Sequence, residues 1–197
     1  MDATAMQQTT PLYKQSYSDA SVLVCRIVDE DDDLSTATAL EQLRWLHRLH
    51  VAIDHVLRTV NATKVDMTGE VMHFVSGTEN GDEDHAASLV SLAHALMTMS
   101  ADMTLPTGQP LQLQMGLHSG QLVTGVVGNL ALKYGVFGTT VTVARQLESL
   151  SSVGTLEQMP GKEGARTSYV GDTGLKCEEM PALWLDGVHW GADESNL

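Results

Sequence analysis

The sequence is poor in cysteine and has no long hydrophobic segment. Its 197 residues include two cysteines, Cys25 and Cys177, and no paired spacing of the kind that binds zinc. A disulfide framework is therefore not expected, and a reducing, cytoplasmic compartment fits this composition best. No stretch approaches the ~18 apolar residues of a membrane-spanning helix, and residues 1–10 are too polar for a signal peptide. We therefore expect no direct insertion into a membrane.

Positive charge is also scarce. The chain has 11 Lys and Arg residues against 25 Asp and Glu residues, which gives a formal net charge of −14. Nucleic acids and anionic membrane surfaces need a basic footprint, so neither is an expected partner. The same charge gives a poor long-range field for a nucleoside triphosphate, although local positive groups can override it.

Aromatic residues are sparse at 5%, whereas hydrophobic residues make up 43% of the chain. That fraction is too high for a disordered chain and is enough for the core of one domain. Leu, Val, Ala and Met must therefore fill most of this core.

The hydrophobic pattern predicts strands and amphipathic helices in alternation. Residues 20–28 form a β-branched, mostly apolar run that is typical of a central strand. Residues 35–60 carry apolar side chains at spacings of three and four, which predicts a helix capped by Asp33 or Ser35. Two strands are expected within residues 64–76, around a hairpin turn at Thr68 and Gly69.

The second half of the chain continues the same alternation. We expect a helix at 84–99, a strand at 111–115, a hairpin partner at 122–127, a helix from 141 to 150 and a last strand at 182–185. The order βαββαβ, followed by extra strands and a helix, predicts an α+β fold with a ferredoxin-like core. We expect its helices to lie on one face of a mostly antiparallel sheet.

Glycines form the most specific pattern in the chain. Residues 115–120 read MGLHSG, residues 125–128 read GVVG, and residues 134–141 read YGVFGTTV before a helix begins. Single glycines usually mark turns, but six in this order between a strand and a helix are far more specific. This block resembles the signature of the class III adenylyl and guanylyl cyclase catalytic domain. The likeness implies the class III cyclase fold.

Other segments extend this resemblance along the chain. Residues 20–28 are similar to the first strand of the family, and residues 64–77 are similar to its metal-bearing hairpin. The likeness covers residues 17–186, which we expect to be the domain. Residues 1–16 are expected to be a flexible leader, and residues 187–197 a tail.

The resemblance implies a reaction and a dimeric site. Cyclases of this family convert a nucleoside triphosphate into a 3′,5′-cyclic monophosphate and pyrophosphate with two divalent metal ions. The site lies between two such domains. One domain supplies two metal-binding aspartates, and the other supplies an Asn, an Arg, a Lys and the residues that recognise the base.

The positions of the two metal aspartates are altered. The first falls on Arg26, whose guanidinium has no lone pair to offer a metal, and the second falls on Glu70, which is still a carboxylate. We hypothesise that Arg26 and Glu70 form an ion pair in place of the metal. No cofactor is expected, and Mg²⁺ or Mn²⁺ would bind only if residual activity remained.

The positions that stabilise the transition state are altered as well. The Asn position falls on Thr142 and the Arg position on Gln146, with Arg145 displaced by one residue and hence by about 100° around the helix. The Lys position falls on Cys177, and Lys176 beside it faces the other way if the segment is a strand.

The base-recognising positions fall on Asp66 and Gly135, a pair that defines neither ATP nor GTP as the substrate. The acidic loop at 29–33 stands where the family cradles phosphate, and its negative charge would repel a triphosphate. His73 replaces an apolar residue of the hairpin, and the sequence assigns it no role.

These substitutions favour a pseudoenzyme of cyclic-nucleotide signalling. The expected function is to regulate or scaffold a partner by forming a homodimer, or a heterodimer with another cyclase-type domain. The alternative is a divergent cyclase that makes cyclic nucleotide weakly from ATP or GTP. A third possibility is a binding module whose cleft holds a nucleotide-like small molecule.

Overall fold

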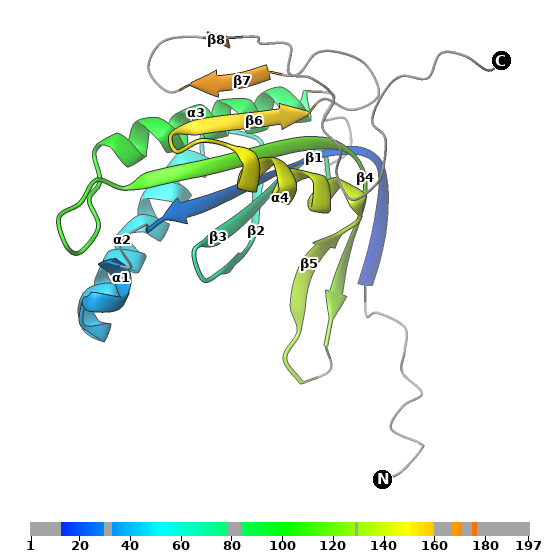
Figure 1. Cartoon of the computed structure of the whole chain (residues 1–197). Coiled ribbons are helices and arrows are strands. Elements are labelled where there is room, and N and C mark those ends of the chain that lie inside the picture. The colour runs from blue at the N-terminus through cyan, green and yellow to red at the C-terminus, as the bar shows by residue number, and fades with distance from the viewer. Residues whose placement is uncertain are drawn as a thin grey trace.

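A mainly antiparallel β-sheet forms the middle of the computed structural model (Figure 1), which describes residues 13–29, 33–78, 84–128, 130–159, 167–170 and 175–176. Its strands are β1 (Tyr13–Val28), β2 (Thr63–Thr68), β3 (Val71–Ser76), β4 (Gln112–Val127), β5 (Lys133–Phe137), β6 (Thr155–Met159), β7 (Thr167–Val170) and β8 (Leu175–Lys176). The strand order is β2-β3-β1-β4-β6-β7-β8, and β5 pairs with β4. The pairing of β4 with β6 is parallel.

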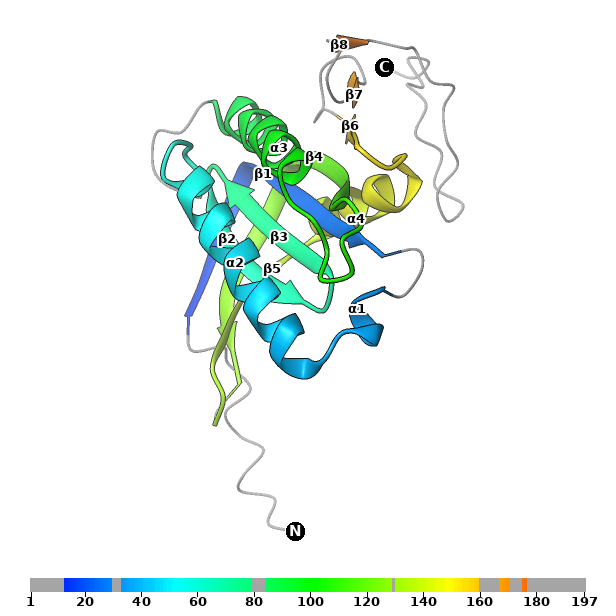
Figure 2. The same ribbon diagram turned by 90° about the vertical axis from the view of Figure 1, so that its left-hand side faces the viewer.

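Helices cover both faces of this sheet. They are α1 (Asp33–Thr36), α2 (Ala39–Leu57), α3 (His85–Ala101) and α4 (Thr139–Leu150). Figure 2 shows α2 and α3 on one face and α4 on the other. The predicted βαββαβ order is confirmed, but the prediction that the helices share one face is wrong for α4. None of the described helices combines the length and hydropathy needed to cross a membrane.

The central strand β1 is buried on both of its faces. Leu23 and Ile27 pack into the core under α2 and α3, and Val22 and Val24 pack into the smaller core under α4. A strand that is buried on both faces has a continuous apolar sequence, which explains the unbroken apolar run at 22–25. Each large apolar side chain buried in this way contributes roughly 1.5–3 kcal/mol.

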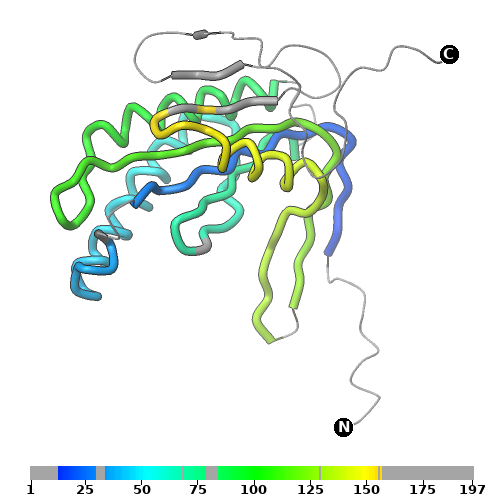
Figure 3. The backbone as a smooth tube through the Cα atoms, viewed as in Figure 1, coloured from blue at the N-terminus to red at the C-terminus, as the bar shows by residue number. Residues whose placement is uncertain are grey.

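Two predicted strand boundaries are wrong. Strand β1 begins at Tyr13, so the predicted leader at 1–16 contains four residues of strand, and β4 is one continuous strand instead of two. Figure 3 shows the start of β1 beside the end of β4, where Tyr13 pairs with Val126 beyond a bulge between Tyr17 and Ala20. This pairing joins backbone groups, so the polar sequence of the strand gives little sign of it.

The start of α2 also differs from the prediction. Thr38 is the cap: its side chain accepts a hydrogen bond from Glu41 N at 3.4 Å, and the Glu41 carboxylate accepts one from Thr38 N at 2.9 Å. The predicted caps, Asp33 and Ser35, belong instead to the separate turn α1. The backbone breaks between the two helices, and α2 begins only at Ala39.

The remaining predictions mostly agree with the structure. The hairpin at 64–76 is formed by β2 and β3, and Gly69 has the positive φ, 61°, that the turn requires. The helices predicted at 84–99 and 141–150 are α3 and α4. The strand predicted at 182–185 and the tail at 187–197 lie outside the described residues.

Gly116 sets how closely α4 approaches the sheet. A Cβ atom at this position would lie 2.2 Å from the Ala144 carbonyl oxygen and 2.2 Å from the Glu148 nitrogen. Both are backbone atoms that a side chain cannot displace without moving the helix. The missing side chain therefore lets α4 rest on β4 and places Arg145 and Glu148 over the centre of the sheet.

Candidate functional site

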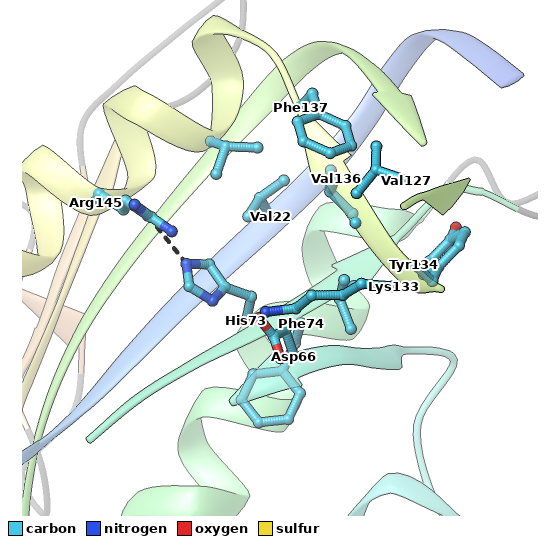
Figure 4. Close-up of a pocket in the computed structure, with 13 residues that line it drawn as sticks. Val22, Asp66, His73, Phe74, Val127, Lys133, Tyr134, Val136, Phe137 and Arg145 are labelled. Carbon is cyan, nitrogen blue, oxygen red and sulfur yellow. Dashed lines mark hydrogen bonds and ion pairs between the residues drawn. The ribbon is translucent and has the colours of Figure 1, made fainter. Parts of the chain in front are cut away.

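Two adjoining pockets form a cleft between the β2–β3 hairpin, β5 and α4. The first has a volume of about 220 Å³ and is lined by the residues whose side chains are drawn in Figure 4. The second, of about 230 Å³, is lined by Arg26, Val71, His73, Arg145 and Glu148. His73 and Arg145 line both pockets, so the two hollows are continuous.

The first pocket unites the two predicted base-recognising positions. Asp66 comes from β2 and Gly135 from β5, and both line this pocket. The Asp66 carboxylate is paired with Lys133, whose Nζ lies 2.7 Å from Asp66 Oδ2. Because a Cβ at Gly135 would approach the Phe137 ring to 2.9 Å, the glycine keeps this part of the pocket open. Lys133 is not among the predicted residues, since its partner Asp66 lies on another hairpin.

His73 joins the two pockets. Arg145 Nε donates a hydrogen bond to His73 Nε2 over 3.0 Å, so this ring nitrogen is the unprotonated acceptor (Figure 4). Burial lowers the pKa of His73, and the positive charge of Arg145 lowers it further. His73 is therefore neutral at pH 7. The sequence gives one sign of this role, since His73 is a titratable side chain between the buried residues Met72 and Phe74.

The second pocket contains a two-point ion pair. Arg26 Nε and Nη2 donate to Glu148 Oε1 and Oε2 over 2.6 and 3.1 Å. The Glu148 side chain is 1% exposed and the Arg26 side chain is 40% exposed. The hydrogen bonds to Glu148 raise the pKa of Arg26, which fixes its positive charge at any physiological pH.

The hypothesised pair between Arg26 and Glu70 is therefore wrong. Glu70 is exposed on the hairpin turn, where its backbone carbonyl accepts a hydrogen bond from Ile27 N at 2.9 Å. Its carboxylate contributes only a weaker electrostatic attraction to Arg26. The close approach of α4 at Gly116 supplies Glu148 as the nearer partner.

The donor set does not fit the two metal ions that the family resemblance implies. At the position that the resemblance assigns to the first metal ligand stands the guanidinium of Arg26, which is already paired with the Glu148 carboxylate. At the second assigned position Glu70 is the one carboxylate. Within the described ranges, no three His, Cys, Asp or Glu side chains are grouped so that they could hold a metal ion.

The transition-state positions lie apart from the cleft. Thr142 is exposed on the first turn of α4, Gln146 is half-buried, and neither lines the two pockets. Arg145 reaches the cleft instead, although it is exposed over much of its length. Cys177 lies outside the described residues, and for Lys176 the structure describes only its backbone, which ends β8.

Among the acidic loop residues, Asp29 has a defined role. Its Oδ2 accepts a hydrogen bond from Leu34 N at 2.8 Å, so it holds the start of α1.

Comparisons of the sequence point to one family. The model of the family described as the adenylate and guanylate cyclase catalytic domain matches residues 12–160. An adenylate cyclase of Mycobacterium tuberculosis is 33% identical over 141 residues, which are 72% of this chain and 32% of that protein. The guanylate cyclase soluble subunit alpha-2 of Rattus norvegicus is 28% identical over 147 residues, 75% of this chain and 20% of that protein. The chain thus spans a third or less of these relatives.

Comparisons of the structure give the same fold. The guanylate cyclase domain of RhGC from Catenaria anguillulae, solved in complex with GTP, superposes with a TM-score of 0.69 at 25% identity, over 73% of this chain and 79% of that one. The adenylyl cyclase CyaB from P. aeruginosa gives a TM-score of 0.63 at 19% identity, over 75% and 79% of the two chains.

Proposed function

The chain belongs to the family of adenylate and guanylate cyclase catalytic domains, and we propose that it is a non-catalytic member that acts by pairing with another cyclase-type domain in cyclic-nucleotide signalling. The observation that carries this proposal is the ion pair between Arg26 and Glu148. It places a fixed positive charge at the position where the family binds its first metal ion.

The ion pair makes metal-dependent cyclisation unfavourable. A divalent cation beside Arg26 would meet a like charge and no available lone pair, and the buried carboxylate nearby is already neutralised. Metal ions and transition-state arginines each account for a rate factor on the order of 10³ or more in phosphoryl chemistry. Losing both reduces cyclisation far below the rates of working enzymes.

A complete partner domain would not restore an efficient site. Two sites form between two cyclase domains, and each needs the metal residues of one domain and the transition-state residues of the other. This chain has substitutions in both sets, at Arg26 in the first and at Thr142 and Gln146 in the second. Each shared site would therefore lack one half.

An exposed apolar arm supports the pairing. The arm consists of the start of β1, the end of β4, β5 and the turn between β4 and β5, which extend away from the rest of the sheet in Figure 1. Among the described residues, seven of the eleven exposed large hydrophobic side chains lie on it: Tyr13, Val123, Val127, Leu130, Leu132, Tyr134 and Phe137. Such a concentration of apolar surface is typical of a protein interface.

The fold neighbours agree with a surface that can pair. A guanylyl cyclase domain from Blastocladiella emersonii has been crystallised in a dimeric form and in a monomeric form. We propose that the arm of this chain seats a second cyclase-type domain, with a second copy of the chain as the first partner to test.

Sedimentation velocity of the purified chain tests the pairing. We expect a dimer, and we expect the double variant Leu130→Glu, Leu132→Glu to be monomeric because both side chains are highly exposed, at 101% and 58%. Leu43→Glu, which changes a 63% exposed residue on α2, is the matched control and should remain dimeric. A wild-type chain that stays monomeric at all concentrations, alone and with a catalytically complete cyclase domain, would contradict the proposal.

The regulatory part needs a second readout. A catalytically complete cyclase domain should change its rate of cyclic nucleotide formation, with saturation, as this chain is added. The arm variant should lose that effect and the Leu43→Glu control should keep it. An effect that is equal for both variants would mean that the arm is not the surface responsible.

A further inference from the structure

A row of three buried serines crosses the sheet beside the base of the arm. Ser21 of β1 is the register partner of Ser76 on β3 and of Ser119 on β4. None of the three is more than 8% exposed. Ser21 lies two residues before Leu23 of the main core, so the row stands on the face of the sheet that α2 and α3 cover. At this end of β1 the buried side chains therefore change from apolar to polar.

His85, the first residue of α3, is hydrogen-bonded to this row. Its Nδ1 lies 2.7 Å from Ser21 Oγ, which in turn lies 2.5 Å from Ser119 Oγ. The histidine is 8% exposed. Gly77 makes room for it, because a Cβ there would lie 3.0 Å from both Cβ and Cγ of His85. One chain of side chains thus connects the start of α3 to β1 and β4.

The other ring nitrogen of His85 faces the bulge at which the arm leaves the sheet. His85 Nε2 lies 3.7 Å from Asp19 Oδ2. Asp19 stands between Tyr17 and Ala20, where the register of β1 with β4 shifts. Residues before this shift belong to the arm, and residues after it form the central strand. The contact between His85 and Asp19 therefore joins α3 to the base of the arm.

The hydrogen bond between His85 and Ser21 exists with either charge on the ring. A neutral ring accepts at Nδ1 from the Ser21 hydroxyl, which leaves the ring hydrogen on Nε2 toward Asp19. A protonated ring donates from Nδ1 to Ser21 Oγ, and the Ser21 hydroxyl then donates to Ser119. Protonation therefore preserves the contact with the serine row and adds a charge at ion-pair distance from Asp19.

The groups around His85 are charged on two sides only. Asp19 faces it from β1, and Asp84 precedes it in the chain and is exposed. The backbone at the start of α3 carries a partial positive charge, which acts against an imidazolium, whereas both carboxylates act for it. Gly77 and Ser119, which approach from β3 and β4, bring no charge. Within the described ranges, Asp19 is the carboxylate that pairs with this ring.

The cluster has the composition of a nucleophilic triad but not the access that one needs. Ser21 is 0% exposed and lines neither of the two pockets. A nucleophile has to reach its substrate, so the hydroxyl of Ser21 is not placed for covalent chemistry. The position of the cluster, at the junction of the arm with the sheet, points to a conformational role.

We propose that His85 and Asp19 form a pH-sensitive tether, which holds the arm against α3 when His85 is protonated and so strengthens pairing as the pH falls. The inference rests on the proposed function, because it takes the arm as the pairing surface and adds its regulation. An imidazole ordinarily gains its proton between pH 8 and pH 5. An arm that is already held in one direction loses less conformational entropy when a partner binds.

Hydrogen exchange tests the tether separately from pairing. The monomeric arm variant, Leu130→Glu with Leu132→Glu, serves as the background. Protection factors, which are corrected for the intrinsic pH dependence of exchange, are measured for the amides at 13–17 and 122–126. We expect them to rise about threefold from pH 8 to pH 6, which is within the range of an exposed ion pair. Asp19→Asn should abolish this rise, and its 70% exposed side chain makes a folding defect unexpected.

Three further variants identify the groups responsible. His85→Gln retains a hydrogen-bonding side chain beside Ser21 but cannot be protonated, so its protection factors should be equal at the two pH values. Asp84→Asn should keep the rise, because the ion pair of the ring is with Asp19. Asp102→Asn removes an exposed carboxylate at the opposite end of α3 and is the matched control, which should also keep it.

Sedimentation of the chain with an intact arm then tests the effect on pairing. The dimer dissociation constant should fall about tenfold from pH 8 to pH 6, since each of two chains contributes a tether of about threefold. In Asp19→Asn it should change far less. Protection factors that are equal at both pH values in the arm variant, or a rise that survives Asp19→Asn, would overturn the inference. Failure of the proposed pairing has a different signature: a chain that is monomeric at both pH values while its arm still shows the rise.

Discussion

The ion pair between Arg26 and Glu148 gives the sharpest prediction about stability. Arg26→Ala leaves a carboxylate that is 1% exposed without the two hydrogen bonds, at 2.6 and 3.1 Å, that now neutralise it. Removing one partner of a fully buried pair costs about 3–5 kcal/mol. Because the Arg26 side chain is 40% exposed, water can reach the Glu148 carboxylate after truncation. We therefore expect Arg26→Ala to lower the free energy of unfolding by about 2 kcal/mol.

Urea unfolding followed by far-UV circular dichroism measures this loss. With a slope of about 2 kcal/mol/M, the midpoint of Arg26→Ala should fall by about 1 M at pH 7. Glu148→Gln in the Arg26→Ala background should recover part of the loss, because a neutral amide leaves no unpaired charge in the core, and the double-mutant cycle should give a coupling of about 1–2 kcal/mol.

Two matched variants make the result decisive. Arg44→Ala, at an exposed position of α2, should stay within about 0.5 kcal/mol of the wild type. Glu70→Gln should also change little, because the structure pairs Arg26 with Glu148 and not with Glu70. The reasoning is refuted if Arg26→Ala is as stable as Arg44→Ala, or if Glu70→Gln costs as much as Arg26→Ala.

Three further predictions concern packing, pH and capping. Gly116→Ala should lower the free energy of unfolding by about 2 kcal/mol or more, since the added Cβ lies 2.2 Å from backbone atoms of α4; an unchanged urea midpoint would contradict this. The pKa of His73 is lower in the folded protein than its ordinary value of about 6.5. The stability that neutral His73 contributes is therefore complete above about pH 6.5, and it is lost as the pH falls from there toward the lowered pKa of the folded protein. His73→Gln should therefore reduce the decline of the thermal midpoint between pH 7 and pH 5, and an unaltered slope would count against it. Thr38→Ala should cost about 1 kcal/mol by removing the cap of α2, whereas equal stability of the two chains would refute that role.

The glycine pattern was the part of the fold that the sequence predicted most reliably. Gly116 meets helix α4 within van der Waals contact, and Gly69 adopts φ of 61° in the hairpin turn. In both places the backbone conformation or the close approach excludes other residues, so the sequence carries the constraint at a single position. The start of β1 at Tyr13 could not be predicted in this way, because its pairing with β4 uses backbone groups.

The contacts of the site were the hardest part to predict. Arg145 meets His73 across 72 residues of sequence, and Arg26 meets Glu148 across 122 residues. The position of Arg26 in the sequence indicated that it needed an acidic partner. Glu70 and Glu148 are both acidic residues near it, and only the packing of α4 on the sheet selects Glu148. The prediction thus identified a displaced charge without identifying the residue that balances it.

The role of His73 illustrates the same limit. Its strand position marked it as a polar residue among buried neighbours, but its function as the link between two pockets depends on where α4 places Arg145. Asp66 and Gly135 were predicted as a pair only because the family resemblance related their positions, and the structure does bring both into one pocket.

The loss of catalysis is tested by the rate of cyclic nucleotide formation by the purified chain with ATP or GTP in the presence of Mn²⁺, measured beside a catalytically complete cyclase domain. Because the family resemblance places Arg26 at the first metal position and Thr142 and Gln146 at the transition-state positions, we expect no product above the uncatalysed background. Sustained formation of cyclic AMP or cyclic GMP by the isolated chain, lost on heat denaturation, would contradict it.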